Sequence, residues 1–110
     1  MNRGDVWTID LGGRTGTRPV VILTRNAVIP YINKVVVVEI TSRSKGYPTE
    51  VAIGQRANLT RESFVQADNL HTVPKHRLRR FHGNLDEATM DSVSKAVVLA
   101  LGLEDARDQV

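Results

Sequence analysis

Residues 17–24 read TRPVVILT, and residues 34–42 read KVVVVEITS. Both stretches are rich in β-branched aliphatic residues and are bounded by turn-forming residues, a pattern that predicts buried strands. The first strand begins beside Arg18, and the second ends at the hydroxyls of Thr41 and Ser42. Two buried strands that bring a cation and a hydroxyl to one rim indicate a phosphate site on a rigid scaffold. The rest of the chain is interpreted as the structure that supports this candidate phosphate site.

Three further segments predict strands. Residues 4–11 alternate between polar and apolar side chains from Val6 onward, which is typical of a half-buried strand. Residues 49–53 predict a short alternating strand. Residues 63–73 form an apolar stretch whose polar centre, Asp68-Asn69, predicts a bend or a bulge between two short strands. The predicted fold class is therefore mainly β.

The C-terminal part of the chain predicts helices. Residues 74–81 are basic, and Pro74 is placed for the first turn of a short helix. A longer helix is expected between a cap at or near Asp86 and a stop at Gly102. Its apolar stripe, expected to pack in the core or in a dimer, consists of Met90, Val93, Val97, Ala100 and Leu101. Residues 103–110 are expected to form a flexible tail.

The composition narrows the class of protein. A length of 110 residues predicts one domain, residues 1–110. The absence of cysteine excludes disulfides, thiol nucleophiles and zinc–thiolate sites. The sequence shows neither a signal peptide nor an apolar run of about 20 residues, so a cytoplasmic protein that does not bind a membrane is expected.

The charge is unevenly distributed along the chain. Residues 1–81 hold 13 Lys and Arg against 6 Asp and Glu, whereas residues 82–110 hold 2 against 6. The β-rich part is therefore basic and the C-terminal part is acidic. A basic face suggests an anionic partner such as nucleic acid, and the alternative is a solvated surface; the charge alone leaves both open.

A glycine-rich loop at residues 12–17 precedes Arg18 and carries Arg14 and Thr17. It is either a plain hairpin connection or a mobile flap over the rim. Its glycine spacing does not match a nucleotide-binding phosphate loop.

A second polar loop, residues 42–48, follows Thr41. Arg43 and Lys45 extend the positive rim, and Tyr47 offers a surface on which a base can stack. The alternative is a solvated turn, and the pairing with Arg18 favours the functional interpretation.

Glu39 is expected on the same strand face as Thr41. It is interpreted as a salt-bridge partner for a nearby arginine, with a role as general base as the alternative. His71, His76 and His82 have no metal-binding spacing and are interpreted as structural or surface residues, so no metal and no cofactor are expected.

Six segments carry a resemblance to a known family: RGDVW at 3–7, RPVVIL at 18–23, EITS at 39–42, PTEV at 48–51, ADNLHTV at 67–73, and Arg77-Leu78. In this order and spacing the chain resembles MazF/PemK-type toxins of bacterial type II toxin–antitoxin pairs, from about Asn2 to about Leu101. The resemblance implies an α+β fold, an SH3-like CcdB/PemK-type β-barrel with a C-terminal helix, that acts as a homodimer.

The resemblance also implies an activity. The expected enzyme is a sequence-specific, metal-independent endoribonuclease that cleaves single-stranded RNA and is neutralised by an acidic antitoxin. The catalytic arginine and threonine of the family fall on Arg18 and Thr41, and loop 12–17 is expected to help cover the RNA. The RNA-binding residues expected around them are Arg14, Thr17, Ser42, Arg43, Lys45 and Tyr47. The chain departs from the family at Asn69, where relatives often carry glutamine, and in its short loop 12–17, which leaves the recognised RNA sequence unassigned.

Two alternative functions compete for the same chain. A CcdB-like gyrase poison requires a tryptophan-containing C-terminal end, whereas the only tryptophan here is Trp7. A non-catalytic nucleic-acid-binding barrel needs a stacking platform, and aromatic residues make up only 5% of the sequence. Such a barrel also leaves Arg18 and Thr41 without a purpose.

Overall fold

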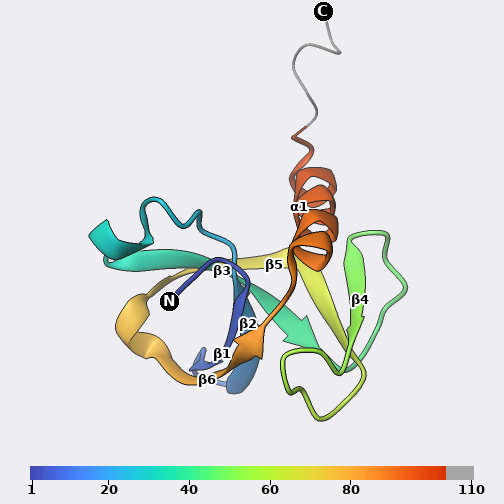
Figure 1. Ribbon diagram of the computed structural model, residues 1–110. Coiled ribbons are helices and arrows are strands. Elements are labelled where there is room, and N and C mark those ends of the chain that lie inside the picture. The colour runs from blue at the N-terminus through green and yellow to red at the C-terminus, as the bar shows by residue number, and fades with distance from the viewer. Residues whose placement is uncertain (104–110) are drawn as a thin grey trace, which may run out of the picture.

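The computed structural model describes residues 1–103, so nearly all of the predicted tail lies outside the described part. Six strands form one antiparallel sheet in the order β4-β5-β3-β2-β1-β6 (Figure 1). The strands are β1 Asp5–Asp10, β2 Thr17–Ile22, β3 Lys34–Thr41, β4 Glu50–Gly54, β5 Ser63–Pro74 and β6 Leu78–Asn84. The helices are α1 Glu87–Leu101 and the one-turn 3-10 helices η1 Ile29–Tyr31 and η2 Lys75–Arg77. The predicted mainly β fold with a C-terminal helix is confirmed.

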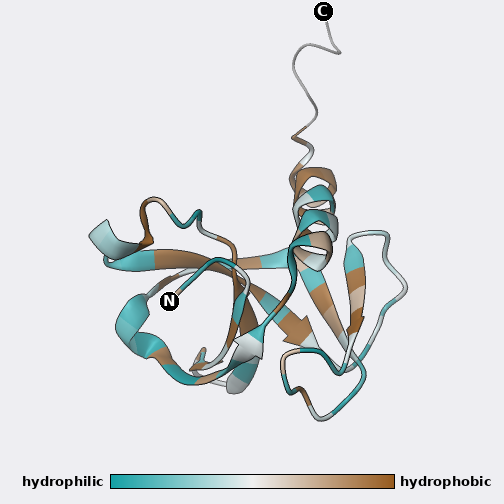
Figure 2. Ribbon diagram, viewed as in Figure 1, coloured by the Kyte–Doolittle hydropathy of each residue, from teal (hydrophilic) through white to brown (hydrophobic). Residues whose placement is uncertain are grey.

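Both faces of the sheet are buried, each in its own apolar cluster. Successive residues of a strand point to opposite faces, so Val38 belongs to one cluster and Val37 to the other. The first cluster includes Met90 and Val93 of α1. The second takes residues from every strand except β4 and includes Ile29 of η1. This double burial explains why β3 is apolar almost throughout (Figure 2).

The curled sheet is not closed into a barrel by hydrogen bonds, because its end strands β4 and β6 do not pair within residues 1–103. The β4–β5 loop spans this gap instead. The side-chain amide of Asn58 donates to the carbonyl oxygen of His82 in β6 at 2.6 Å. Ala57 and Asn58 have φ angles of 55° and 60°, which turn the loop back toward β6.

The segment predicted as two short strands is one continuous strand, β5. The predicted irregularity at its polar centre is nevertheless confirmed. Val38 of β3 faces Leu70, and Ile40 faces Val65, so a step of two residues on β3 spans five on β5. The additional residues of β5 bulge out of the ladder, which increases the local twist and bends the strand.

The helix predicted for residues 74–81 is largely wrong. Only Lys75–Arg77 form a single 3-10 turn, and the chain then enters the edge strand β6. Pairing with β1 overrides the helical tendency, because Trp7 faces Phe81 and Ile9 faces Leu78. The rings of Trp7 and Phe81 meet edge to face, with centroids 5.6 Å apart, and stabilise this pairing.

The predicted boundaries of α1 are confirmed. The carboxylate of Asp86 accepts a hydrogen bond from the backbone N–H of Thr89 at 2.8 Å, and Gly102 ends the helix with a left-handed φ of 67°. Leu101, at the far end of the predicted stripe, is 53% exposed and so does not pack in the core of this chain, and its packing in a dimer stays a prediction. Figure 1 shows the reason for this exposure: the last turns of α1 extend beyond the sheet. None of the helices in residues 1–103 is long and apolar enough to span a bilayer.

Gly83→Ala is expected to destabilise the protein by about 1–3 kcal/mol. A Cβ atom on this residue of β6 would meet the Cα of Ala57 at 3.1 Å and its carbonyl carbon at 3.3 Å. Because both are backbone atoms, the β4–β5 loop must shift and weaken its Asn58 hydrogen bond. Thermal unfolding measures the effect, with the exposed neighbour Asn84→Ala as the control. Equal midpoints for Gly83→Ala and wild type would contradict it.

Candidate functional site

Arg18 and Thr41 lie on neighbouring strands at the same end of the sheet. Val20 of β2 faces Glu39 of β3, and continuing that antiparallel register by two residues places Arg18 opposite Thr41. Both residues line a pocket of about 200 Å³, which we call the Arg18 pocket. The sequence-based expectation that a guanidinium and a hydroxyl share one rim therefore agrees with the geometry.

The guanidinium of Arg18 is partly restrained and partly free. The residue is half-buried, and its Nε donates to the carbonyl oxygen of Thr15 in the β1–β2 loop at 3.2 Å. Within residues 1–103 its two terminal nitrogens have no hydrogen-bond partner. They remain available to an oxyanion, and the Nε hydrogen bond limits the orientations that the side chain adopts.

Thr41 is half-buried at the end of β3. Its hydroxyl oxygen accepts a hydrogen bond from the backbone N–H of Arg43 at 3.1 Å. This bond uses a lone pair and leaves the hydroxyl proton free to donate. Thr41 therefore presents one donor beside the free donors of Arg18.

The β4–β5 loop supplies a wall of the Arg18 pocket that was not expected from the sequence. Thr17 and Ser42, both expected near the RNA, line the pocket with Pro19 and Ile40. The loop adds Leu59, Thr60 and Arg61, and the first residue of β5 adds Ser63. Arg61 brings a second guanidinium to the site. The sequence predicts only a polar connection for residues 54–63, so Arg61 was missed, and its charge is the one signal that could have found it.

The other expected RNA-binding residues lie outside the Arg18 pocket. Arg14 and Arg43 are exposed in the loops on either side of it. Lys45 and Tyr47 line a smaller pocket of about 70 Å³ with Glu50, Gln66, Asp68 and Asn69. Tyr47 is 55% exposed, so its ring is open to a stacking base.

Glu50 organises the β3–β4 loop that carries these residues. Its carboxylate accepts hydrogen bonds from the hydroxyl of Ser44 at 2.8 Å and from the backbone N–H groups of Lys45 and Gly46 at 3.1 Å. The side-chain amide of Gln66 donates at 3.1 Å. The Gln66 bond, followed by the Lys45 N–H, lowers the pKa of Glu50 from 4.5 to about 2. The loop is thus held by a carboxylate that stays charged.

Acidification is expected to loosen this loop only at very low pH. The pKa of Glu50 is lower in the folded protein, so its contribution is complete above about pH 4.5 and is lost as the pH falls toward 2. NMR shifts of the amides of residues 44–46 should titrate with a midpoint near 2, and a midpoint near 4.5 would contradict the prediction. Glu50→Gln should abolish this titration and speed amide exchange in the loop, whereas the exposed Glu62→Gln serves as the control.

The predicted partner of Glu39 is wrong. Its carboxylate bonds to Nε2 of His71 at 2.6 Å instead of to an arginine. The β3–β5 register explains this, because His71 faces Val37 and so lies diagonally across from Glu39 on the same face. Glu39 does not line the Arg18 pocket. In residues 1–103 no group of three or more His, Asp or Glu side chains is arranged to hold a metal ion.

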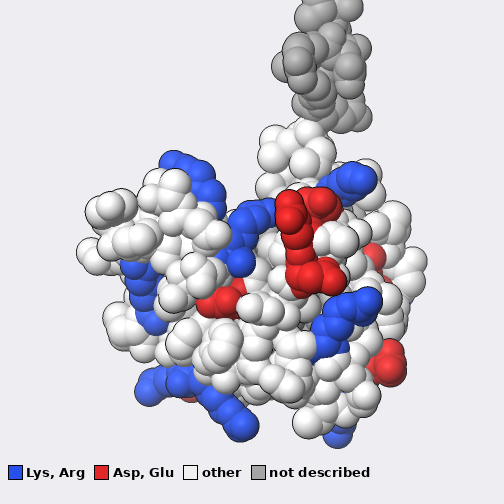
Figure 3. Space-filling model, in the orientation of Figure 1, with Lys and Arg blue, Asp and Glu red and all other residues white. Residues whose placement is uncertain are grey.

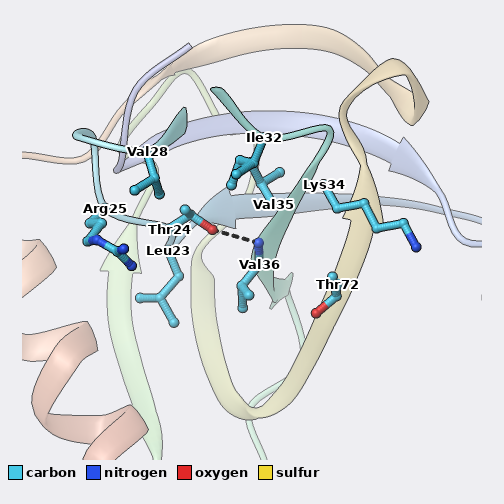
Figure 4. A pocket seen from close by; sticks show the side chains of 9 residues that line it. All are labelled: Leu23, Thr24, Arg25, Val28, Ile32, Lys34, Val35, Val36 and Thr72. Carbon is cyan, nitrogen blue, oxygen red and sulfur yellow. Dashed lines mark hydrogen bonds between the residues drawn. The ribbon is translucent and has the colours of Figure 1, made fainter. Parts of the chain in front are cut away.

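A larger pocket lies elsewhere, beside η1. It has a volume of about 510 Å³ and contains none of the expected site residues (Figure 4). Its walls are mostly aliphatic, with Arg25 and Lys34 on its border, and Thr24 closes one side through a 2.8 Å hydrogen bond from the N–H of Val36. This lining suits an apolar side chain better than a phosphodiester.

Comparisons with known proteins agree with the resemblance. The family described as "PemK-like, MazF-like toxin of type II toxin-antitoxin system" matches residues 2–101. Endoribonuclease MazF1 of Mycobacterium bovis is 38% identical over 101 residues, covering 92% of each chain. Endoribonuclease MazF of Staphylococcus saprophyticus is 32% identical and covers 97% of this chain and 96% of the relative.

A solved structure is also similar to this chain in fold and in sequence. It is described as an endoribonuclease in complex with its cognate antitoxin from a mycobacterial species. The two chains superpose with a TM-score of 0.85 at 35% identity, covering 96% of this chain and 98% of the other. The chain therefore belongs to the MazF/PemK-like toxins of type II toxin–antitoxin systems. Within that class it is an endoribonuclease.

Proposed function

We propose that this toxin is a sequence-specific, metal-independent endoribonuclease that cleaves single-stranded mRNA in the cytoplasm and thereby stops translation and growth. The observation that carries the proposal is the Arg18 pocket. It combines the free terminal nitrogens of Arg18 with the free hydroxyl proton of Thr41, and Arg61 adds positive charge. Three donors around one small cavity suit a single phosphodiester.

RNA supplies its own nucleophile for this cleavage. The 2′-oxygen attacks the adjacent phosphorus, the bond from phosphorus to the 5′-oxygen breaks, and the products are a 2′,3′-cyclic phosphate and a 5′-hydroxyl. The proton of the 2′-hydroxyl leaves to a base, and the departing 5′-oxygen gains a proton. Arg18 holds the non-bridging oxygens with its two terminal nitrogens, and Thr41 donates a third hydrogen bond. These hydrogen bonds align the attack and stabilise the negative charge that develops on the non-bridging oxygens.

The base in this step is a separate question. A guanidinium stays protonated in proteins, so Arg18 acts through its charge and its hydrogen bonds. Glu39 is the candidate base: it does not line the Arg18 pocket, but it lies on the same strand face as Thr41 at a Cα separation of about 7 Å. Its carboxylate is hydrogen-bonded to the imidazole of His71.

The loops beside the Arg18 pocket hold the RNA on both sides of the scissile bond. Thr17 and Ser42 contact the strand at the pocket, and Arg14, Arg43 and Lys45 bind neighbouring phosphates from the loops. Tyr47 stacks on a base. Together they account for a preference for single-stranded RNA, whose bases are free to stack.

Two features of the surface, its basic charge and the exposed apolar residues of α1, suggest which proteins bind this toxin. A mycobacterial relative is described in complex with its cognate antitoxin. An acidic antitoxin segment with apolar anchors neutralises this toxin by lying across the basic rim and excluding RNA. The toxin acts as a homodimer, and the exposed apolar residues Val98, Leu99 and Leu101 at the end of α1 offer part of the interface.

The test is to incubate purified protein with RNA in EDTA. We expect cleavage at defined sites with cyclic-phosphate and 5′-hydroxyl ends. A gyrase poison or a non-catalytic RNA-binding barrel leaves the RNA intact, and an intact RNA would overturn the proposal. Mapping the 5′ ends of cleaved transcripts identifies the recognised sequence.

A further inference from the structure

A strongly basic segment lies outside the Arg18 pocket, along η2 and β6. From Asn69 to Leu85 the sequence has no acidic residue, and it contains Lys75, Arg77, Arg79 and Arg80. All three arginines are exposed. Figure 3 shows basic side chains projecting from the area where η2 and β6 lie in Figure 1. Within residues 1–103 no Asp or Glu side chain forms a salt bridge with any of these arginines.

Two of the arginines line a pocket rather than an open surface. Asp10, Gly12, Arg77 and Arg79 enclose about 260 Å³ between the start of the β1–β2 loop and β6. One carboxylate oxygen of Asp10 accepts the N–H of Gly12 at 2.8 Å, which fixes the carboxylate in place. Its second oxygen has no partner among residues 1–103. The pocket thus offers two guanidiniums and one oriented acceptor.

Lys75, another basic residue of η2, does not contribute a free positive charge to this pocket. Its ammonium donates to the carbonyl oxygen of Ile29 and so ties η2 to η1. The positive charge of the pocket therefore depends on Arg77 and Arg79, and we call the site the Arg77–Arg79 pocket.

The Arg77–Arg79 pocket adjoins the Arg18 pocket across the base of the β1–β2 hairpin. Thr17 lines the Arg18 pocket and Asp10 lines the other, and the two residues face each other in the β1–β2 ladder. Directly opposed residues in such a ladder have Cα atoms about 4.5–5.5 Å apart. A strand of RNA that leaves the Arg18 pocket and crosses the hairpin base therefore enters the Arg77–Arg79 pocket.

We propose that the Arg77–Arg79 pocket is a second nucleotide subsite, which binds the same RNA strand a short distance from the scissile phosphate. This inference rests on the proposed function and deepens it. Arg77 and Arg79 bind a phosphodiester as a pair of guanidiniums. The free oxygen of Asp10 accepts an N–H group of the attached base, so the subsite favours a nucleotide over a simple anion. The subsite contributes binding energy and leaves the chemical step to the Arg18 pocket.

The test measures binding to an RNA that cannot be cut. A short oligonucleotide spanning the mapped cleavage site carries a 2′-O-methyl group at the scissile nucleotide, and two shortened versions keep only its 5′ or only its 3′ half. The variant is Arg77→Gln with Arg79→Gln, and the control is Arg25→Ala, which changes an exposed arginine beside the pocket at η1. Fluorescence anisotropy gives the affinity at several salt concentrations, and circular dichroism checks the fold.

We expect the double variant to bind the full oligonucleotide roughly tenfold more weakly, whereas the control variant binds it normally. The slope of log affinity against log salt should fall by about 0.7, because the double variant no longer neutralises one phosphate. One half oligonucleotide should show the same weakening, and the other should bind the variant and wild type equally. Unchanged affinity for the full oligonucleotide, or equal weakening on both halves, would overturn the subsite.

The two proposals fail in different ways. Normal cleavage together with unchanged binding by the double variant overturns the subsite alone. If the wild-type protein cuts no RNA, the proposed function fails, and the pocket is then tested with a random-sequence 2′-O-methyl RNA. In that case the same weakening in the double variant supports the pocket as an RNA site, and its absence overturns it.

Discussion

Arg18→Ala is expected to abolish RNA cleavage while the protein remains folded. Removing one donor that stabilises developing charge typically lowers kcat by 10²–10³, about 2.7–4 kcal/mol. Arg18 supplies two such donors, so the loss of activity should reach or exceed the upper end of that range. The fold should tolerate the change, because among residues 1–103 the half-buried side chain makes a single hydrogen bond, to the Thr15 carbonyl oxygen. Single-turnover cleavage assays and thermal unfolding measure the two effects.

Two control variants sharpen the interpretation of Arg18→Ala. Arg25→Ala removes an exposed arginine outside the Arg18 pocket and should cut RNA at the wild-type rate. Arg18→Lys keeps the charge but cannot form two parallel hydrogen bonds to one phosphate, so it should recover only a small part of the activity. A folded Arg18→Ala protein that cuts RNA as fast as wild type would remove the physical basis of the proposed mechanism.

A single 2′-deoxy substitution at the cleavage nucleotide is expected to block cleavage of an otherwise normal RNA. The proposed nucleophile is the 2′-oxygen, and the substitution removes it without changing the phosphate that Arg18 and Thr41 hold. Binding should therefore stay close to that of the unmodified RNA, and only the rate should fall. Gel assays of cleavage and anisotropy measurements of binding separate the two quantities.

The position of the substitution provides the control. A 2′-deoxy group placed several nucleotides away leaves the nucleophile intact, so that RNA should be cut normally. Cleavage of the first RNA at the unmodified rate would mean that water attacks the phosphorus, and the product would then carry no cyclic phosphate. In that case the structure would have to supply a base that activates water.

The central strands were predictable because their local sequence pattern indicates that they are buried. β3 is buried on both faces, so its run of four valines followed by Glu39 indicates a strand with little ambiguity. The positions of Arg18 near the start of β2 and of Thr41 at the end of β3 then follow from where these two apolar runs begin and end. Their meeting in one pocket agrees with the prediction because neighbouring antiparallel strands bring those two ends together.

The parts that escaped prediction depend on pairing between distant segments. β6 carries adjacent arginines and directly follows the 3-10 turn η2, and its pairing with β1 makes it a strand. Arg61 reaches the Arg18 pocket because the β4–β5 loop folds back onto β6. No local sequence pattern predicts this loop conformation. The bond between Glu39 and His71 likewise depends on the β3–β5 register.

The position of β6 at the end of the sheet has a consequence for how the protein behaves at high concentration. An edge strand exposes unpaired N–H and C=O groups that invite a strand of another molecule to pair with it, and charged side chains discourage that association. Arg79 and Arg80 place two like charges on this edge. Replacing both with valine or isoleucine should therefore cause the toxin to aggregate through its β6 edge.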